Sequence, residues 1–585
     1  MNILIKAVRI SGFRGLQNIE VELEKITVLT GMNNTGKTSF LKALQLALGY
    51  RQFVSQDDFF IQGSNVSEKI IIDLLIIPIN PDGRQCDKFS GDWEILFTTD
   101  RIRMDDSEKS FVPLRTIIVF DQIKNSYKTQ QFILQTWPEF EDKGSVFWFQ
   151  TENGTEKHFR FDEVPFFYMD AQRDILEDIK LRTSYLGKMI SKIEYSEKDI
   201  IEIEEQIKIL NEKTVNSSDI LSNIKTTLKG LDTAMDTTSE GVEITPFTKK
   251  IRDLNKGLSI YYTDKKESFS MEYHGMGTRS WSSLLTLKAF ISLLNAKAEK
   301  DKSLFSPILA IEEPEAHIHP NAQRKLYEQI NEIFGQKIIA THSPYIAASA
   351  ELKQIRNFYK HEDDICCGKI KMDELEPEDI RKIERQVINT RGEIFFSKAI
   401  VFCEGETEEQ ALHMFAEHHF DKKPEGMGIN FVGIGGNGNY LPFMRFAEGL
   451  NILWFIFSDA EGNVKNEVQK QFNECGCSRD EKDTIVFLDN GNNFEKQLIS
   501  DGFSDEIKKA IIVLTDFKNK QHRQAKTEEI NSCNDEEILK KITNNKTKHA
   551  PVIAEKIIES KKELPPKIIE LFNIIQSFLG GKEVD

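Results

Sequence analysis

The stretch ITVLTGMNNTGKTSFLKALQLALG, residues 26–49, decides the fold of the first part of the chain. Its apolar start predicts a strand, a glycine-containing turn follows, and the spacing of TSFLKALQLAL predicts a helix. The turn has the pattern G-x-x-x-x-G-K-[ST], in which backbone N–H groups cradle phosphates, Lys37 contacts the β/γ-phosphates and the Thr38 hydroxyl ligates Mg²⁺. We therefore predict an ATP site that includes Asn33, Asn34, Thr35, Gly36, Lys37, Thr38 and Ser39.

Two later strand ends supply the remaining groups of a nucleotide site. The run ILAIEEPE ends in a carboxylate pair, in which Glu312 is expected to hold Mg²⁺ through water and Glu313 to position the attacking water. The next apolar strand ends in THSP, where His342 stands at the place of a γ-phosphate sensor. The simpler readings are a solvated strand end for the acids and a structural histidine.

A second group of acids follows two apolar runs in the last third of the chain. AIVFCEGETEEQ places Glu404 after a strand, and NILWFIFSDAEGN places Asp459 and Glu461 after another. In an open α/β sheet, ligands bind at the carboxyl ends of the strands, and carboxylates there hold Mg²⁺ or Mn²⁺. Two such ions, about 4 Å apart, stabilise the attacking and leaving oxygens of a phosphodiester. Glu408 is either a further ligand or a first-turn residue favoured by the helix dipole.

The chain has 585 residues, a length that predicts two or three domains. Strands are expected between residues 70 and 170 at IIIDLLIIPI, WEILFTT, RTIIVFD and SVFWFQ. The proline-free charged and aliphatic run that follows predicts either an antiparallel helical arm or a helical insertion packed on its own domain. The predicted ranges are 1–174 and 241–360 for the two ATPase lobes, 175–240 for the arm, 361–397 for a linker and 398–585 for the last domain.

Charge and cysteine usage limit the partners and the compartment. The net charge of −17 means that nucleic acid can bind only through a local groove, a metal ion or an oligomer. Seven scattered cysteines indicate reduced thiols. The first residues show no export signal, and no run of about 18 apolar residues occurs, so a cytoplasmic protein without a membrane anchor is expected.

The motifs together resemble the OLD family, in which an ABC-type ATPase head, akin to those of Rad50 and SMC proteins, precedes a C-terminal Toprim domain. The predicted fold class is accordingly α/β. Two departures are a glutamate, Glu312, for the usual Walker B aspartate, and Asp459-Ala460-Glu461 for D-x-D. The resemblance implies a signature motif at Gly275, Gly277 and Ser280 that completes the nucleotide site of an opposite head. It also implies a later acid at Glu495 and a lysine at Lys548, or less well Lys546, that stabilises charge on the scissile phosphate.

The resemblance further implies an ATP-regulated, divalent-metal-dependent DNA endonuclease in bacterial antiphage defence, using ATP with Mg²⁺ or Mn²⁺. A homodimer or homotetramer is expected, with a defence-system partner such as a helicase or a retron reverse transcriptase with its RNA–DNA hybrid. The alternative is a non-nucleolytic ATPase of the SMC/Rad50 type that binds nucleic acid in chromosome maintenance or repair. A topoisomerase or primase is less favoured, because no tyrosine nucleophile context or zinc module accompanies the Toprim-like segment.

Overall fold

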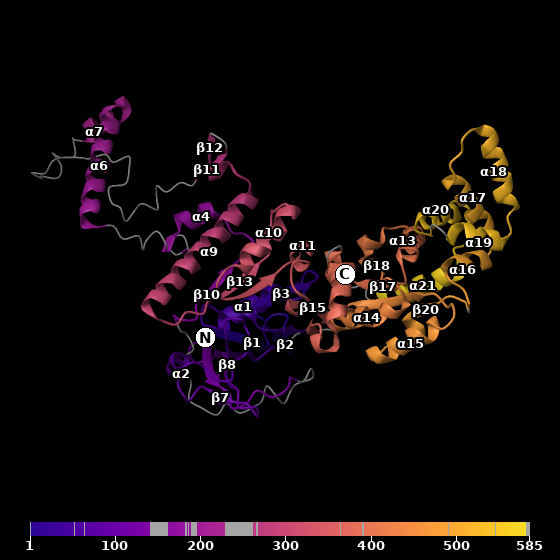
Figure 1. Ribbon diagram of the computed structural model, residues 1–585. Helices are drawn as coiled ribbons and strands as arrows, with labels where there is room; N and C mark the ends of the chain where they lie inside the picture. Colours follow the sequence, from indigo (N-terminus) through magenta and orange to yellow (C-terminus); the bar gives the residue numbers. More distant parts are fainter. Residues whose placement is uncertain are drawn as a thin grey trace, which may run out of the picture. The chain divides into compact units, whose positions relative to one another are not determined.

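The protein, analysed as a computed structural model, divides into two compact units, residues 1–160 with 338–585 and residues 161–337 (Figure 1). The structure describes residues 2–51, 53–63, 65–140, 162–181, 184, 187–188, 196–228, 261–264, 267–362, 364–388, 391–489, 491–543 and 546–580. Within these ranges no helix has both the length and the apolar character needed to cross a membrane.

The strands are β1 Asn2–Ser11, β2 Ile19–Glu22, β3 Ile26–Gly31, β4 Ile61–Gln62, β5 Asn65–Val66, β6 Lys69–Ile79, β7 Arg103–Met104, β8 Ser110–Asp121, β9 Ser126–Ile133, β10 Phe166–Met169, β11 Tyr261–Asp264, β12 Glu267–Ser270, β13 Ile308–Glu312, β14 Gln336–Ala340, β15 Ile355–His361, β16 Asp364–Gly368, β17 Ala399–Cys403, β18 Ile429–Gly433, β19 Leu453–Ser458 and β20 Ile485–Phe487. The helices are α1 Lys37–Ala47, α2 Gly91–Phe97, α4 Ile175–Lys180, α6 Glu197–Asn216, α7 Asp219–Leu228, α9 Met276–Asp301, α10 Pro320–Asn331, α11 Pro344–Ala347, α12 Pro377–Ile383, α13 Glu406–Phe420, α14 Tyr440–Gly449, α15 Val464–Cys475, α16 Phe494–Ser500, α17 Ser504–Leu514, α18 Lys520–Ser532, α19 Asp535–Thr543, α20 Lys546–Glu559 and α21 Pro566–Gly580.

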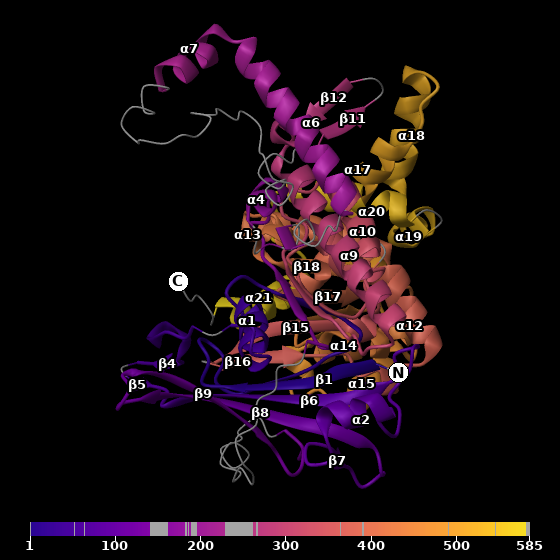
Figure 2. The same cartoon turned by 90° about the vertical axis from the view of Figure 1, so that its left-hand side faces the viewer.

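The first unit contains an antiparallel sheet of order β2-β1-β6-β8-β7, with β9 paired to β8 (Figure 2). The central strand β6, KIIIDLLIIPI, is buried along almost its whole length, and its one acid, Asp73, lies opposite Arg115 of β8. The guanidinium donates from Nε and Nη2 to the two carboxylate oxygens at 2.8 and 2.7 Å, and both side chains are fully buried. A bidentate pair of this kind satisfies charge that the apolar sheet would otherwise not tolerate.

One of the expected strands in this region is a helix. WEILFTT was predicted as extended, but residues Gly91–Phe97 form α2. Trp93 and Phe97 are both buried and stand one helical turn apart, with their rings stacked 5.5 Å between centroids, so the apolar spacing fits period 3.6 better than period 2. SVFWFQ, residues 145–150, lies outside the described residues.

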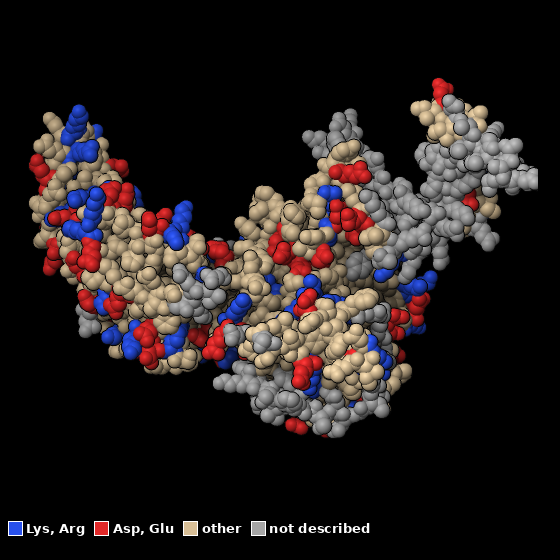
Figure 3. All heavy atoms as spheres, turned by 180° about the vertical axis from the view of Figure 1, so that it is seen from behind, with Lys and Arg blue, Asp and Glu red and all other residues tan. Residues whose placement is uncertain are grey.

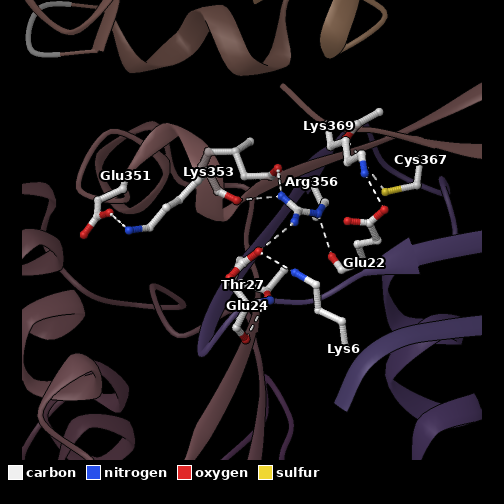
Figure 4. A network of polar contacts seen from close by, with 11 residues as sticks. Lys6, Glu22, Glu24, Thr27, Glu351, Lys353, Arg356, Cys367 and Lys369 are labelled. Atoms are coloured by element: carbon white, nitrogen blue, oxygen red, sulfur yellow. Dashed lines mark hydrogen bonds and ion pairs between the residues drawn. The ribbon is translucent and has the colours of Figure 1, made fainter. Parts of the chain in front are cut away.

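The strand that precedes the glycine-rich turn, β3, pairs in parallel with β15, and β15 pairs antiparallel with β16. The start of the segment predicted as a linker thus forms the edge strand, β16, of the sheet that contains β3. A polar network joins this hairpin to the antiparallel sheet (Figure 4). Its centre, Arg356, is 3% exposed and donates to the carbonyl oxygen of Glu22 at 2.6 Å, while Lys369 contacts the Glu22 carboxylate.

The last third of the chain forms a four-stranded parallel sheet of order β18-β17-β19-β20. The strands β17 and β19 are almost entirely buried, because helices cover the sheet, as expected for parallel strands joined by crossover helices. Helix α13 packs on α20, and α17 packs on α18, α19 and α20. One hydrophobic core runs from β17 through these helices to Phe572 and Ile575 of α21.

In the second unit, β10 pairs in parallel with β13, so that Met169 lies opposite Ile311. Helix α4 contacts α9, and α6 contacts α7. Helices α6 and α7 lie in the range predicted for the helical arm, and residues 229–260 lie outside the described residues. The arm and the other domain boundaries therefore stay predictions.

Replacing Arg115 by Met leaves the Asp73 carboxylate buried without its guanidinium, and we expect a loss of about 3–5 kcal/mol of stability. Urea denaturation of Arg115→Met measures this loss. The control is Lys567→Met, which breaks the Lys567–Glu570 ion pair on α21 (2.8 Å) and is expected to cost about 1 kcal/mol or less. Equal losses in the two variants would contradict the structural role of the buried pair.

Candidate functional site

The glycine-rich turn lies between β3 and α1, as predicted. Gly31 has φ 126°, and a Cβ there would lie 2.2 Å from the carbonyl oxygen of Phe358, so only glycine fits at the end of the strand. The Lys37 ammonium is buried and donates to the carbonyl oxygens of Gly31 at 2.8 Å and Met32 at 2.9 Å. Asn33 and Asn34 are exposed at the crest of the turn. Two carbonyl oxygens of the loop therefore hold the Lys37 cation at the turn, where it is available for an anion.

The predicted γ-phosphate sensor lies in the same unit. Thr341 donates its N–H to the carbonyl oxygen of Leu29 at 3.1 Å, which places His342 next to the strand that leads into the turn. Ser343 caps α11 by accepting N–H groups of Tyr345 and Ile346. The half-buried imidazole stacks on Phe396, with 6.4 Å between ring centroids.

The predicted acid pair follows β13 in the second unit. The hydroxyl of Tyr168 donates to a carboxylate oxygen of Glu312. Glu313 has φ 43°, a left-handed conformation that turns the chain sharply after the strand. Arg173 is 7% exposed and donates to the carbonyl oxygens of this turn, including that of Pro314 at 2.6 Å. Burial lowers the pKa of Arg173 to about 10, so the guanidinium stays charged and fixes the turn.

The candidate signature residues begin α9. Gly275 is the exposed N-cap, and Gly277 lies so close to the Glu313–Pro320 turn that a Cβ would be 2.2 Å from the carbonyl oxygen of His317. Ser280 is only 1% exposed, and its assignment to a signature motif stays a prediction. Arg279 pairs with Asp174 at 3.0 Å inside the same unit.

The two principal acids of the last domain follow neighbouring parallel strands. Glu404 comes directly after β17 and Asp459 directly after β19, and these strands pair in register along Ala399–Cys403. Oε2 of Glu404 and Oδ1 of Asp459 are both buried atoms. The carbonyl oxygen of Glu404 accepts the N–H groups of Gly435 at 3.0 Å and Gly436 at 2.9 Å. The glycine-rich turn after β18 therefore fixes the backbone that carries the first acid.

Two further acids lie near these two, because Glu408 bonds the residue after Glu404 and Glu495 lines a small pocket with Thr407. Burial raises the pKa of Glu408 to about 7, and the nearby charges of Glu495 and Glu404 act in the same direction. Glu408 is 7% exposed and accepts the N–H of Gly405 at 3.0 Å. Glu495, on α16, is 3% exposed. Glu408 and Glu495 are thus the buried members of this group of acids, and a cation nearby would favour the charged forms of all four.

Glu461 is placed differently. Its carboxylate accepts a hydrogen bond from the Lys496 ammonium at 2.7 Å, and about two fifths of each side chain is exposed. Lys548 is exposed on the first turns of α20, and the side chain of Lys546 lies outside the described residues. The neighbouring residue, His549, lines a small pocket with Thr407 and Glu495. This end of α20 therefore lies against the acidic edge, a name used below for Glu404, Glu408, Asp459 and Glu495.

Within the described residues, no three His, Cys, Asp or Glu side chains gather closely enough to form a coordination sphere for a metal ion. The donors nevertheless suit a hard cation, because all are carboxylates and at least two present buried oxygens. The chemistry of the donor set thus fits Mg²⁺ or Mn²⁺, and the ligand assignment stays a prediction.

Sequence reasoning missed Arg391 and Lys496. Arg391 donates to the carbonyl oxygen of Phe431 at 2.7 Å and to one carboxylate oxygen of Glu409. The other oxygen of Glu409 accepts the N–H of Gly433 at 2.8 Å. Arg391 thereby ties the start of α13 to the end of β18. Neither residue belongs to a motif, and only the fold brings each one to its partner.

Comparison with known proteins defines the class. Residues 4–347 match the family described as AAA ATPase domain, and residues 395–460 match the TOPRIM domain of overcoming lysogenization defect protein-like sequences. The chain belongs to the AAA ATPase domain family and carries an OLD-like Toprim domain after the ATPase part. The predicted α/β fold class and domain order are confirmed.

Three curated relatives narrow the resemblance. The chain is 23% identical to the OLD nuclease of Thermus scotoductus over 78% of its own length and 82% of that protein. It is 24% identical to the endonuclease GajA of Bacillus cereus over 49% of its length and 46% of that protein. It is 27% identical to the uncharacterized protein YbjD of Escherichia coli over 32% of its length and 33% of that protein. The matches with GajA and YbjD thus span less than half of those relatives.

The close contact at Gly277 gives a test of the second unit. We expect Gly277→Ala to cost about 1–3 kcal/mol, because the new methyl meets a backbone oxygen that cannot move aside. Gly275→Ala, two residues earlier, places its methyl in open space and is expected to cost at most about 1 kcal/mol. Thermal unfolding of both variants measures the difference. Equal shifts in melting temperature would mean that α9 does not pack against the turn as described.

Proposed function

We propose that the chain is an ATP-regulated, divalent-metal-dependent DNA endonuclease of the OLD family that acts in antiphage defence. The observation that carries the proposal is the pair Glu404 and Asp459, which follow adjacent parallel strands, β17 and β19, and each present one buried carboxylate oxygen. The names of two relatives, an OLD nuclease and an endonuclease, support the same reading. We further propose that the chain acts as a homodimer or homotetramer. Its proposed partner in the defence system is a helicase or a retron reverse transcriptase with its RNA–DNA hybrid.

The proposed cleavage uses the acidic edge as follows. Glu404, Asp459 and Glu408 would hold one or two divalent ions, which when bound would lower the pKa of a water molecule and stabilise charge on the phosphodiester. Lys496, which pairs with Glu461 and is about two fifths exposed, would offer a positive charge to the DNA backbone. Lys548, on the exposed surface of α20, is the proposed second cation for the scissile phosphate.

The proposed ATP chemistry uses the other motifs. Lys37 would exchange its two carbonyl contacts for phosphate oxygens, and Thr38 would ligate Mg²⁺. Glu312 and Glu313 would serve the metal and the attacking water, and His342 would contact the γ-phosphate.

Plasmid cleavage in Mg²⁺ or Mn²⁺ tests the proposal. We expect the purified chain to nick or linearise DNA, and Glu404→Gln to lose at least about 100-fold in rate, because a neutral amide cannot replace a charged ligand. The matched control is Glu406→Gln, an exposed acid two residues away that should keep its activity. If Glu404→Gln cuts as fast as Glu406→Gln, the assigned site is wrong. Parallel reactions of wild type and Lys37→Ala with ATP give the direction of nucleotide regulation.

A second test concerns the clamp at Arg391. We expect Arg391→Gln to reduce cleavage about 10–100-fold and to raise the Mn²⁺ concentration needed for half-maximal rate, because groups that orient ligands typically contribute this much. Arg391→Lys keeps the charge but loses the planar guanidinium that reaches two acceptors. Its cleavage rate should therefore lie between those of Arg391→Gln and wild type. Arg445→Gln, which removes a donor to the carbonyl oxygen of Glu374, is the control. An unchanged metal dependence in Arg391→Gln would exclude a positioning role.

A further inference from the structure

One short segment is basic, although the chain as a whole is acidic. The protein has 93 acidic and 76 basic residues. Between residues 508 and 526, six charged residues are basic and one is acidic, namely Lys508, Lys509, Lys518, Lys520, Arg523 and Lys526 against Asp516. Like charges at such spacing repel one another, so this composition does not serve the stability of the helices.

The structure concentrates the charges around the turn between α17 and α18. Asn519 caps α18 by accepting the N–H of His522 at 2.8 Å, and the guanidinium of Arg523 lies 5.6 Å from the ring centroid of Phe517. Lys518, Lys520 and Arg523 are exposed. In the part of the chain that the structure describes, none of these three forms an ion pair with an acid, whereas Lys526, one turn further on, pairs with Glu529 at 2.6 Å.

The elements that carry this turn are packed back to the acidic edge. Helix α18 contacts α17, α17 contacts α20, and α20 contacts α13, which begins two residues after Glu404. All of them share the core that includes Ile507, Ile530 and Ile553. Figure 3 shows Lys and Arg side chains in blue at the upper end of the lobe formed by these helices. The basic turn is therefore held by a continuous scaffold and is not a separate tail.

We propose that the basic turn, defined as Lys518, Lys520 and Arg523, binds the phosphate backbone of double-stranded DNA. This inference rests on the proposed function, for which it names the substrate-binding surface. Exposed ammonium and guanidinium groups without acidic partners are free to neutralise phosphates and release condensed counterions. The aromatic ring beneath Arg523 limits the freedom of its side chain, so less entropy is lost when it contacts a phosphate.

The test measures duplex binding as a function of salt, with the full-length chain and a fluorescent 30-base-pair DNA in EDTA, where metal-dependent cleavage does not occur. Wild type is compared with the triple variant Lys518→Gln, Lys520→Gln, Arg523→Gln. We expect the slope of log K against log salt to become shallower by about 0.9 for each lost phosphate contact, or about 2 to 3 in total. The dissociation constant at low salt should rise roughly tenfold or more.

The matched control is Lys422→Gln, Lys423→Gln, Lys470→Gln, which removes the same charge from exposed positions elsewhere in the unit and should bind as wild type. Equal slopes for the two triple variants would overturn the proposal, and so would competition by polyglutamate as effective as that by DNA, because the turn would then be a general anion or protein contact. If the slope falls as expected but wild type never cuts DNA with Mn²⁺, the binding surface stands and the nuclease proposal fails. If wild type cuts DNA but the two triple variants bind it equally, the nuclease proposal stands and the basic turn is not the binding surface.

Discussion

The Toprim part of the molecule is organised around the cost of placing several carboxyl groups at one desolvated edge of a parallel sheet. The register of β17 and β19 brings Glu404 and Asp459 to neighbouring strand ends, and helix α13 and α16 add Glu408 and Glu495. Burial raises the pKa of Glu408 to about 7, and the charges of Glu495 and Glu404 add to that rise. Such an arrangement persists only if the backbone around it is fixed and a cation compensates the charge when one is present.

The backbone around these acids is held by contacts with the elements that follow β14, a strand of the sheet containing β3. The short 3₁₀ helix at Gly392–Phe396 lies so close to α11 that a Cβ at Gly392 would be 2.2 Å from the carbonyl oxygen of Pro344. At one end of this helix Phe396 stacks on His342, and just before the other end Arg391 holds Glu409. A segment of six residues therefore contacts both the predicted phosphate sensor and the helix that follows Glu404.

The sequence was most informative where function depends on neighbours in the chain. A phosphate loop and the acids at strand ends are local patterns, and the structure finds Lys37, Glu404 and Asp459 where those patterns predicted. The sequence was least informative for contacts made by the fold. Arg391 reaches Glu409 across 18 positions and Lys496 reaches Glu461 across 35, and neither distance has a signal in the sequence. WEILFTT was misread because a short amphipathic helix and a strand present similar apolar content.

An acidic protein that acts on DNA has to solve two opposed electrostatic problems in one unit. The site for a cation needs unbalanced carboxylates, whereas the substrate is itself a polyanion that those carboxylates repel. Placing the two charges on different elements eases the conflict, because salt screens charges over about 8–10 Å. In this chain Glu404 and Asp459 each keep one buried oxygen at the ends of β17 and β19, and the bases without acidic partners are exposed at Lys518 and on the first turn of α18. The net charge of −17 is thus compatible with a DNA substrate, because the sign of the local surface, and not the total, governs the approach of a duplex.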